Sequence, residues 1–314
     1  MTADLTSPIF TDETAAREHF ESLRWADGRV CPHCGTVGNS TLLQGRTTRP
    51  GLYKCKDCRK PFSAIMGTVY EKSHIPLHKW LLATHLMVSS KKGISAHQLF
   101  RMLGFGSYRT AWFMAHRIRE AMDGGDVTPP MGSDGGAVEV DETFIGNLKD
   151  RAKGKGGFAH KMKVVSLVER NTGRARSVVV NDLSLATIGP IMDANMSRRA
   201  HLMTDEAPRY TSIGWNFAAH GVVNHSKDEY VRYDATITHT NTVEGFFSVF
   251  KRGMRGVYQH CGEQHLHRYM NEFDFRYSNR IALGVDDKTR AARAVTGAVG
   301  KRLTYRQPHG LQAA

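Results

Sequence analysis

The sequence lacks the features of a membrane or secreted protein. No apolar run approaches the length of a membrane-spanning helix, which takes about 20 residues. Residues 1–5 carry neither the basic nor the apolar region of a secretory signal peptide. We therefore expect a cytoplasmic protein.

Cysteine is scarce, and its few positions are informative. Of five cysteines, four form two C-x-x-C pairs, Cys31 with Cys34 and Cys55 with Cys58. In a reducing compartment such pairs indicate metal rather than disulfides, and the C-x2-C-x20-C-x2-C spacing is typical of a four-thiolate zinc site. We predict a zinc ribbon whose metal supplies much of its folding free energy. The alternative, a thioredoxin-like redox pair, lacks the surrounding strand and helix pattern, and Cys261 has no nucleophile context.

Acidic residues are fewer than basic ones. The chain of 314 residues has 30 Asp and Glu against 43 Lys and Arg, a formal charge of +13. The basic residues run through nearly the whole length rather than forming a tail. This surplus favours a polyanionic partner, with nucleic acid as the default. The alternative is a basic protein without such a partner.

A helical region follows the cysteine pairs. Ser95 and Ser107 can each cap a helix, with a glycine-containing turn over residues 104–106 between the two. Two helices joined in this way resemble a helix-turn-helix. The second helix would present Arg109 and Arg117 to DNA.

Beyond residue 136 the pattern changes to strands and helices. Residues 137–145 alternate apolar with more polar positions, as a half-buried strand does. Thr240 can cap the last long helix of this region. We predict, in chain order, strands over 137–145, 163–169 and 174–180, a helix over 184–196, strands over 200–204 and 221–225, and a helix over 241–253. This is the order of an RNase H-like α/β core, a mixed sheet with flanking helices.

Three carboxylates fall at key places in that order. Asp141 lies in the first strand, Asp205 ends the fourth, and Glu244 lies in the first turn of the last helix. The first and fourth strands are neighbours in such a sheet, and Asn241 shares a helix face with Glu244. Because a buried Asp is costly unless it is paired or binds a metal, we predict that the three meet around divalent ions to cut or join nucleic acid. The alternative for each is an ordinary surface carboxylate.

Basic side chains near these acids are candidates for phosphate contact. Lys251, Arg252 and Arg255 would lie beyond the first turn of the last helix. Lys153 and Lys155 fall in a glycine-rich loop over residues 147–160. The alternative for the helix end is a solvated cluster that is placed favourably for the helix dipole.

Six motifs resemble those of bacterial transposases of the insertion sequence 1595 family, over about residues 30–280. They are CPHCG, YKCKDCRKPFS, VEVDETFIG, LMTDE, HTNTVEGFFSVFKRGMRGVYQH and HRYMNEFDFRYSNR. The resemblance implies a zinc ribbon and a DDE-type transposase domain that cleaves DNA at terminal inverted repeats and joins the 3′ ends to target DNA. It also implies double-stranded DNA as partner, catalytic Mg²⁺ or Mn²⁺, and association with the bacterial nucleoid.

The resemblance also assigns the acidic residues. Asp141 and Asp205 match the first two, while the third position stays open between Asn241 and Glu244. Mg²⁺ prefers anionic oxygen, which favours Glu244 and leaves Asn241 as a ligand or orienting group. The glutamates that directly follow the two aspartates should point to the opposite face of the sheet, and we leave them out.

Five segments and one assembly are predicted. The segments are an N-terminal helix and zinc ribbon (1–72), a helix-turn-helix-like region (73–123), a Gly- and Pro-rich linker (124–136), a catalytic domain (137–283), and a basic tail (284–314) with a helix over 286–305. Since transposition holds two DNA ends together, we expect a homodimer or larger assembly on DNA. The alternatives to a transposase are a metal-dependent nuclease with the same core and a non-catalytic DNA-binding protein.

Overall fold

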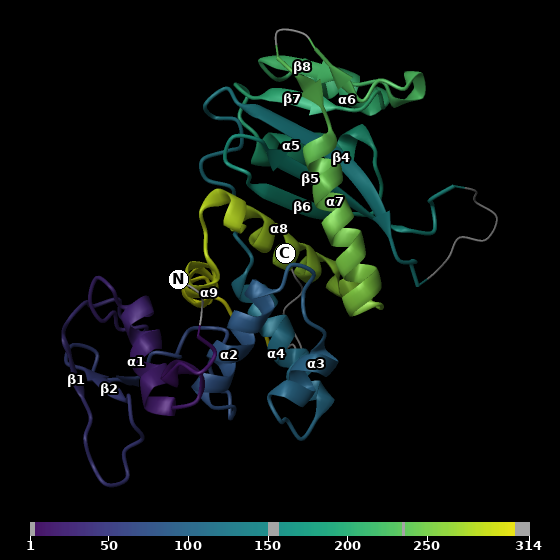
Figure 1. The fold of residues 1–314 in the computed structure, drawn as a ribbon. Helices are drawn as coiled ribbons and strands as arrows, with labels where there is room; N and C mark the ends of the chain where they lie inside the picture. Colours follow the sequence, from purple (N-terminus) through teal and green to yellow (C-terminus); the bar gives the residue numbers. More distant parts are fainter. Residues whose placement is uncertain (1–3, 150–156, 234–235, 305–314) are drawn as a thin grey trace. The chain divides into compact units, whose positions relative to one another are not determined.

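The chain forms two compact units (Figure 1). A computed structural model describes residues 4–149, 157–233 and 236–304. Unit 1 consists of Met1–Ser90, Ile94–Met122 and Asp286–Ala314, and unit 2 of Lys91–Gly93 and Asp123–Val285. The predicted linker therefore lies within unit 2, and the described part of the tail lies almost wholly within unit 1. None of the helices in the described ranges is long and apolar enough to cross a membrane.

Unit 1 begins with a helix and a small sheet. Helix α1 (Glu13–Arg24) starts at Asp12, whose side chain accepts the Ala15 N–H at 2.7 Å, as an N-cap does. Strands β1 (Ser40–Leu42), β2 (Tyr53–Cys55) and β3 (Pro61–Phe62) pair in antiparallel order. The buried cluster beneath them is small and consists of Cys31, Tyr53, Cys55 and Phe62.

Helices make up the rest of unit 1: α2 (Leu77–Ser89), α3 (Ala96–Met102), α4 (Tyr108–Ala121) and α9 (Asp287–Thr296). The predicted caps of α3 and α4 are confirmed, because Ser95 accepts the Gln98 N–H and Ser107 accepts the Arg109 N–H. Helix α9 is shorter than the helix predicted over 286–305, since Gly297 forms its C-cap. Its buried Ala294 and Val295 pack in this unit.

Unit 2 is built on a five-stranded sheet in the order β6-β5-β4-β7-β8. Its strands are β4 (Ala137–Ile145), β5 (Met162–Glu169), β6 (Ala175–Val180), β7 (His201–Thr204) and β8 (Ala219–Val222). Strand β4 is antiparallel to β5 and parallel to β7. The first three strands form a meander because the turn at Gly173, with φ +69°, reverses the chain. The predicted RNase H-like mixed sheet is confirmed, with β8 two residues earlier than expected at its start.

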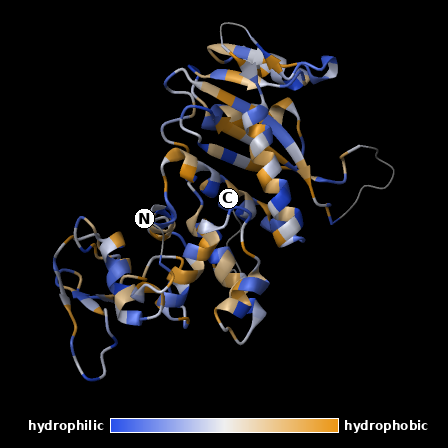
Figure 2. Cartoon of the chain, in the orientation of Figure 1, coloured by the Kyte–Doolittle hydropathy of each residue, from blue (hydrophilic) through white to orange (hydrophobic). Residues whose placement is uncertain are grey.

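Different helices pack on the two faces of the sheet (Figure 1). On one face, Val138 and Val140 of β4 pack in a cluster with α5 (Leu185–Asn195) and α6 (Pro208–Gly214). On the other face, Ile145 packs in a cluster with α7 (Asn241–Gly253) and α8 (Leu266–Ser278). Helix α7 carries both hydrophobic and hydrophilic residues (Figure 2). Its buried residues Val243, Phe246, Phe247 and Phe250 recur every three or four positions and so share one face, as in an amphipathic helix on a sheet. Odd-numbered residues of β4 from 139 to 145 thus face α7.

A buried acid in α8 makes the stability of unit 2 depend on pH. Asp274 accepts the N–H and the Oγ–H of Ser177, each at 2.7 Å. Burial raises the pKa of Asp274 to about 7, whereas an unfolded Asp titrates near about 3.9. The folded state therefore binds the extra proton between about pH 4 and 7, and this group's contribution to stability falls by up to about 1.4 kcal/mol per pH unit as the pH rises.

Asp274→Asn keeps the shape of the protonated acid. We expect its free energy of unfolding, relative to wild type, to rise steadily from pH 5 to 7 and to level off above. Urea unfolding of both proteins at pH 5, 6, 7 and 8 measures this difference. Parallel stability curves across that range would show that Asp274 does not titrate there.

Candidate functional site

Four cysteine thiols meet in unit 1. The Sγ atoms of Cys31 and Cys58 lie 3.7 Å apart, those of Cys34 and Cys55 lie 3.6 Å apart, and all four lie within 4.8 Å of one another. Sulfurs bound at about 2.3 Å to one tetrahedral zinc lie about 3.8 Å apart. Gly35 closes the first knuckle with φ +77°, a conformation that favours glycine. The cluster therefore fits a structural zinc ion held by these four residues.

Two aspartates lie side by side in unit 2. The parallel register of β4 and β7 pairs Val138 with Leu202 and Glu139 with Met203. Continued by two residues, it sets Asp141 beside Asp205, which directly follows β7. Neighbouring strands lie about 4.8 Å apart. Sheet topology, rather than nearness in sequence, thus brings these two carboxylates together.

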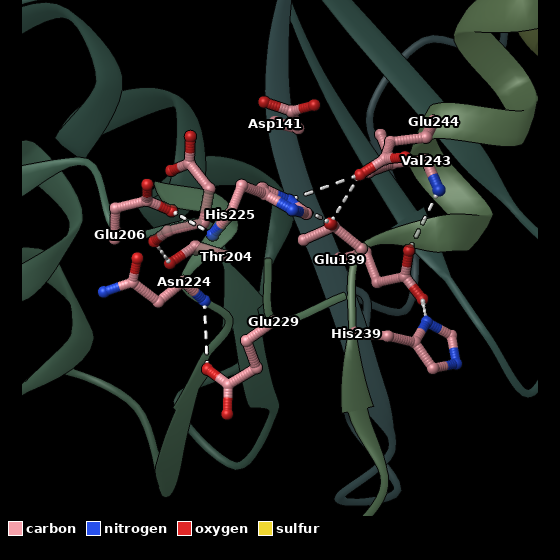
Figure 3. Close-up of polar contacts among 12 residues, drawn as sticks. Glu139, Asp141, Thr204, Glu206, Asn224, His225, Glu229, His239, Val243 and Glu244 are labelled. Atoms are coloured by element: carbon pink, nitrogen blue, oxygen red, sulfur yellow. Dashed lines mark hydrogen bonds and ion pairs between the residues drawn. The ribbon is translucent and has the colours of Figure 1, made fainter. Parts of the chain in front are cut away.

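Helix α7 adds a third carboxylate on the same face of the sheet. Glu244 lies in its first turn, and Figure 3 shows its carboxylate beside the strand that carries Asp141. Its Oε1 accepts the hydroxyl of Thr240 at 2.8 Å and lies 3.5 Å from Nε2 of His225. Asn241 is the first residue of the same helix and is exposed.

The electrostatics of Asp141 reflect these neighbours. Burial raises the pKa of Asp141 to about 8, and repulsion from Glu142, Asp205 and Glu244 adds to the shift, while the Glu142 N–H, 2.7 Å from Oδ1, opposes it. Ionising this carboxyl group beside other acids is costly, and a bound cation would offset that cost.

The spacing of the acids differs from that of the cysteines. Among the residues that the structure describes, the four cysteines are the set whose ligand atoms lie within 4.8 Å of one another. The carboxylate oxygens of Asp141, Asp205 and Glu244 do not all lie within that distance of one another. These three acids therefore do not approach one another as closely as the ligands of the cysteine cluster do.

The glutamates that follow the two aspartates have other partners. Glu142 accepts the hydroxyl of Tyr210 at 2.6 Å and pairs with Arg209 at 2.7 Å. Glu206 accepts the hydroxyl of Ser226 at 2.5 Å and the N–H of His225 at 3.0 Å, and these hydrogen bonds lower its pKa to about 2. Both carboxylates therefore hold local structure together.

The cap of α7 is not the one predicted from the sequence. Thr240 precedes the helix but makes no side-chain cap bond, and its hydroxyl donates to Glu244 instead. The first N–H groups of α7 are bound by Glu139 of β4, which is fully buried. The prediction for Thr240 was wrong because a carboxylate from the neighbouring strand is a stronger acceptor for helix N–H groups than the local hydroxyl.

Sequence reasoning missed two residues near the acids, Glu139 and His225. A signal for Glu139 was present: in VEVDETFIG it lies two positions before Asp141, and the period of a strand puts both on one face. No signal pointed to His225, which lies beyond β8 and reaches Glu244 only through the fold.

The predicted DNA-contacting residues divide into three groups. Lys251 is partly exposed, and Arg252, Arg255 and Arg109 are exposed. Arg117 is buried in unit 1, where its guanidinium lies 5.1 Å from the ring centre of Trp80 and donates to the Glu71 carbonyl. This geometry gives Arg117 a packing role. Lys153 and Lys155 fall outside the described residues.

The described structure thus combines an RNase H-like sheet, which carries Asp141 and Asp205 near Glu244, with a four-cysteine cluster that fits zinc. Two family models match the chain: an ISXO2-like transposase domain over residues 134–278 and a transposase zinc-ribbon domain over residues 11–61. Over these two stretches the chain is similar to transposases.

One relative and one solved structure accompany these matches. The chain is 27% identical over 285 residues to an uncharacterized protein in transposable element ISH50 of Halobacterium salinarum, with 85% of this chain and 91% of the relative covered. It is 10% identical to the Drosophila P element transposase strand transfer complex, covering 74% of this chain and 66% of that one, with a TM-score of 0.28. A likeness that low supports no argument about fold or function.

Proposed function

We propose that the protein is a DDE-type transposase that cleaves DNA at the terminal inverted repeats of an insertion sequence and joins the 3′ ends to target DNA. The observation that carries this proposal is the placement of three carboxylates on one sheet face. Asp141 and Asp205 lie on neighbouring strands, and Glu244 approaches from α7. The similarity of two stretches of the chain to transposase family models supports the same activity.

In this proposal the carboxylates position divalent ions against the scissile phosphate. Mg²⁺ or Mn²⁺ held there would supply Lewis-acid activation of a water or a DNA 3′-hydroxyl and stabilisation of the departing oxygen. Asp141 and Asp205 each contribute ligand oxygens to that site. No covalent protein intermediate is required, which agrees with the chemistry of the residues gathered there.

Glu244 is the proposed third ligand, and Asn241 is the competing one. Glu244 offers an anionic oxygen within contact of Thr240 and His225, and a hard cation prefers such an oxygen to a neutral amide. Asn241, three residues earlier, would then orient substrate or an ion-bound water. Glu244→Ala should therefore reduce cleavage more than Asn241→Ala.

Double-stranded DNA is the proposed partner, with two transposon ends and a target bound by a homodimer or larger assembly at the nucleoid. The excess of positive charge in the sequence supports contact with phosphates. Candidates for these contacts on the described surface are Lys251, Arg252, Arg255 and Arg109. The lysines of the glycine-rich loop, Lys153 and Lys155, stay predictions.

The test uses purified zinc-loaded protein, end-labelled duplex carrying the DNA that flanks the gene, and Mg²⁺ or Mn²⁺. We expect nicking at the element ends only with metal, followed by joined products. Nicking without joining would favour a nuclease with the same core. Binding without cleavage under all metal conditions would favour a DNA-binding protein and contradict the proposal.

A further inference from the structure

Glu139 ties the first turn of α7 to β4. Its side chain is 0% exposed, and its Oε2 accepts the backbone N–H of Thr242 at 2.8 Å and of Val243 at 2.9 Å. Its Oε1 accepts the Thr242 hydroxyl at 2.7 Å. A carboxylate at a helix N-terminus makes strong, charge-assisted hydrogen bonds. The start of α7 is therefore fixed to a strand that lies about 100 residues earlier in the chain.

Arg170 completes the connection. It directly follows β5, and its Nε donates to Oε1 of Glu139. Its other two nitrogens donate to backbone carbonyls, Nη1 to Ile237 at 2.7 Å and Nη2 to His239 at 2.8 Å. Those carbonyls flank Thr238 in β10 (Thr238–His239), the strand that leads into α7. The ion pair of Glu139 and Arg170 thus holds the chain on both sides of Thr240: Arg170 binds the carbonyls before it, and Glu139 binds the N–H groups after it.

This pair stands next to the proposed metal ligands on both elements. Asp141 is two residues beyond Glu139 on the same face of β4, a rise of about 7 Å. Glu244 directly follows Val243, whose N–H Glu139 binds. Figure 3 shows Glu139, Asp141, Val243 and Glu244 around the start of the helix. A shift of the first turn of α7 would therefore move Glu244 relative to Asp141.

We infer that Glu139, paired with Arg170, is a positioning residue that holds Glu244 at the spacing from Asp141 that divalent-ion binding needs. This inference rests on the proposed function. Both oxygens of Glu139 are occupied: Oε2 accepts two N–H groups, and Oε1 accepts from Thr242 and Arg170 and lies 3.1 Å from Nδ1 of His239. The residue therefore acts on the ligands rather than as one. Glutamine cannot replace it, because an amide has one acceptor oxygen and would turn its NH₂ group toward other donors.

The test measures Mn²⁺ affinity of the full-length, zinc-loaded protein by electron paramagnetic resonance of free Mn²⁺. We expect Glu139→Gln to raise the Kd about 10-fold or more, the range seen when a partner that orients a metal ligand is lost. Thr242→Val removes only one of the hydrogen bonds and should raise the Kd about 2- to 5-fold. It keeps the inference testable if Glu139→Gln does not fold.

Glu169→Gln is the matched control. Glu169 is also buried and paired with an arginine, Arg174, at 2.9 Å, but it belongs to the other face of the sheet. Its loss should lower the melting temperature without changing the Mn²⁺ Kd. Wild-type affinity in folded Glu139→Gln and in Thr242→Val, with binding still lost in Asp141→Ala, would overturn this inference alone. Mn²⁺ binding that does not depend on Asp141 would instead contradict the proposed function and, with it, this inference.

Discussion

Asp141→Ala and Asp205→Ala are each expected to lower the rate of metal-dependent DNA cleavage by about 10³-fold or more, which corresponds to roughly 4 kcal/mol of transition-state stabilisation. Each substitution removes one of the two carboxylates that β4 and the end of β7 hold at the proposed ion site. Single-turnover cleavage of the end-labelled duplex, at saturating protein and Mg²⁺, measures this effect without interference from product release.

Folding should survive these changes, and Asp141→Ala should even be favourable without metal. Its carboxyl group is partly buried, with a pKa raised to about 8, so removing it relieves a desolvation penalty. We expect an unchanged or higher melting temperature for the zinc-loaded protein without added Mg²⁺, and the loss of any Mg²⁺-induced rise. Asp193→Ala is the control, because Asp193 forms a surface pair with Arg198 at 3.0 Å and should change cleavage little. Cleavage by Asp141→Ala at a near wild-type rate would exclude Asp141 as a ligand.

Local sequence patterns were enough to predict the zinc ribbon and the order of strands. The C-x2-C spacing specifies a knuckle within four residues, and strand periodicity together with the turn at Gly173 specifies the meander. The parallel pairing of β4 and β7 followed from the order of elements. Each of these features depends on residue types and their spacing within the sequence, so it could be predicted without knowing which distant residues meet.

Contacts between distant segments were not predictable in the same way. Glu139 meets Thr242 only because Phe246 and Phe250 bury α7 on the sheet, and nothing near Glu139 in the sequence names its partner. Arg109 and Arg117 look alike in sequence, yet one is exposed and the other packs beside Trp80. Which face of a helix is buried depends on the neighbouring elements, and this decides whether an arginine can reach DNA.

Removal of zinc is expected to unfold the ribbon while leaving unit 2 folded. The ribbon has only a small buried cluster, with three short strands around it. Zinc binding to such modules is worth about 10–16 kcal/mol at neutral pH, more than a core of this size provides. Cys55→Ser replaces a fully buried ligand and should release most of the zinc. Amide hydrogen exchange over residues 31–62 should then accelerate toward the unfolded rate, with exchange in β4 and β5 unchanged.

Cys261→Ser is the matched control for this prediction. Cys261 lies in unit 2, where its sulfur contacts the Gly262 carbonyl at 3.3 Å, so its replacement should leave one zinc per chain. A colorimetric assay of released zinc compares the two variants directly. Loss of zinc with wild-type protection in Cys55→Ser would mean that the ribbon is held by its apolar contacts. Loss of zinc together with loss of protection would instead show that metal binding and folding of this module are one event, because its small buried cluster does not hold the two knuckles together without the metal.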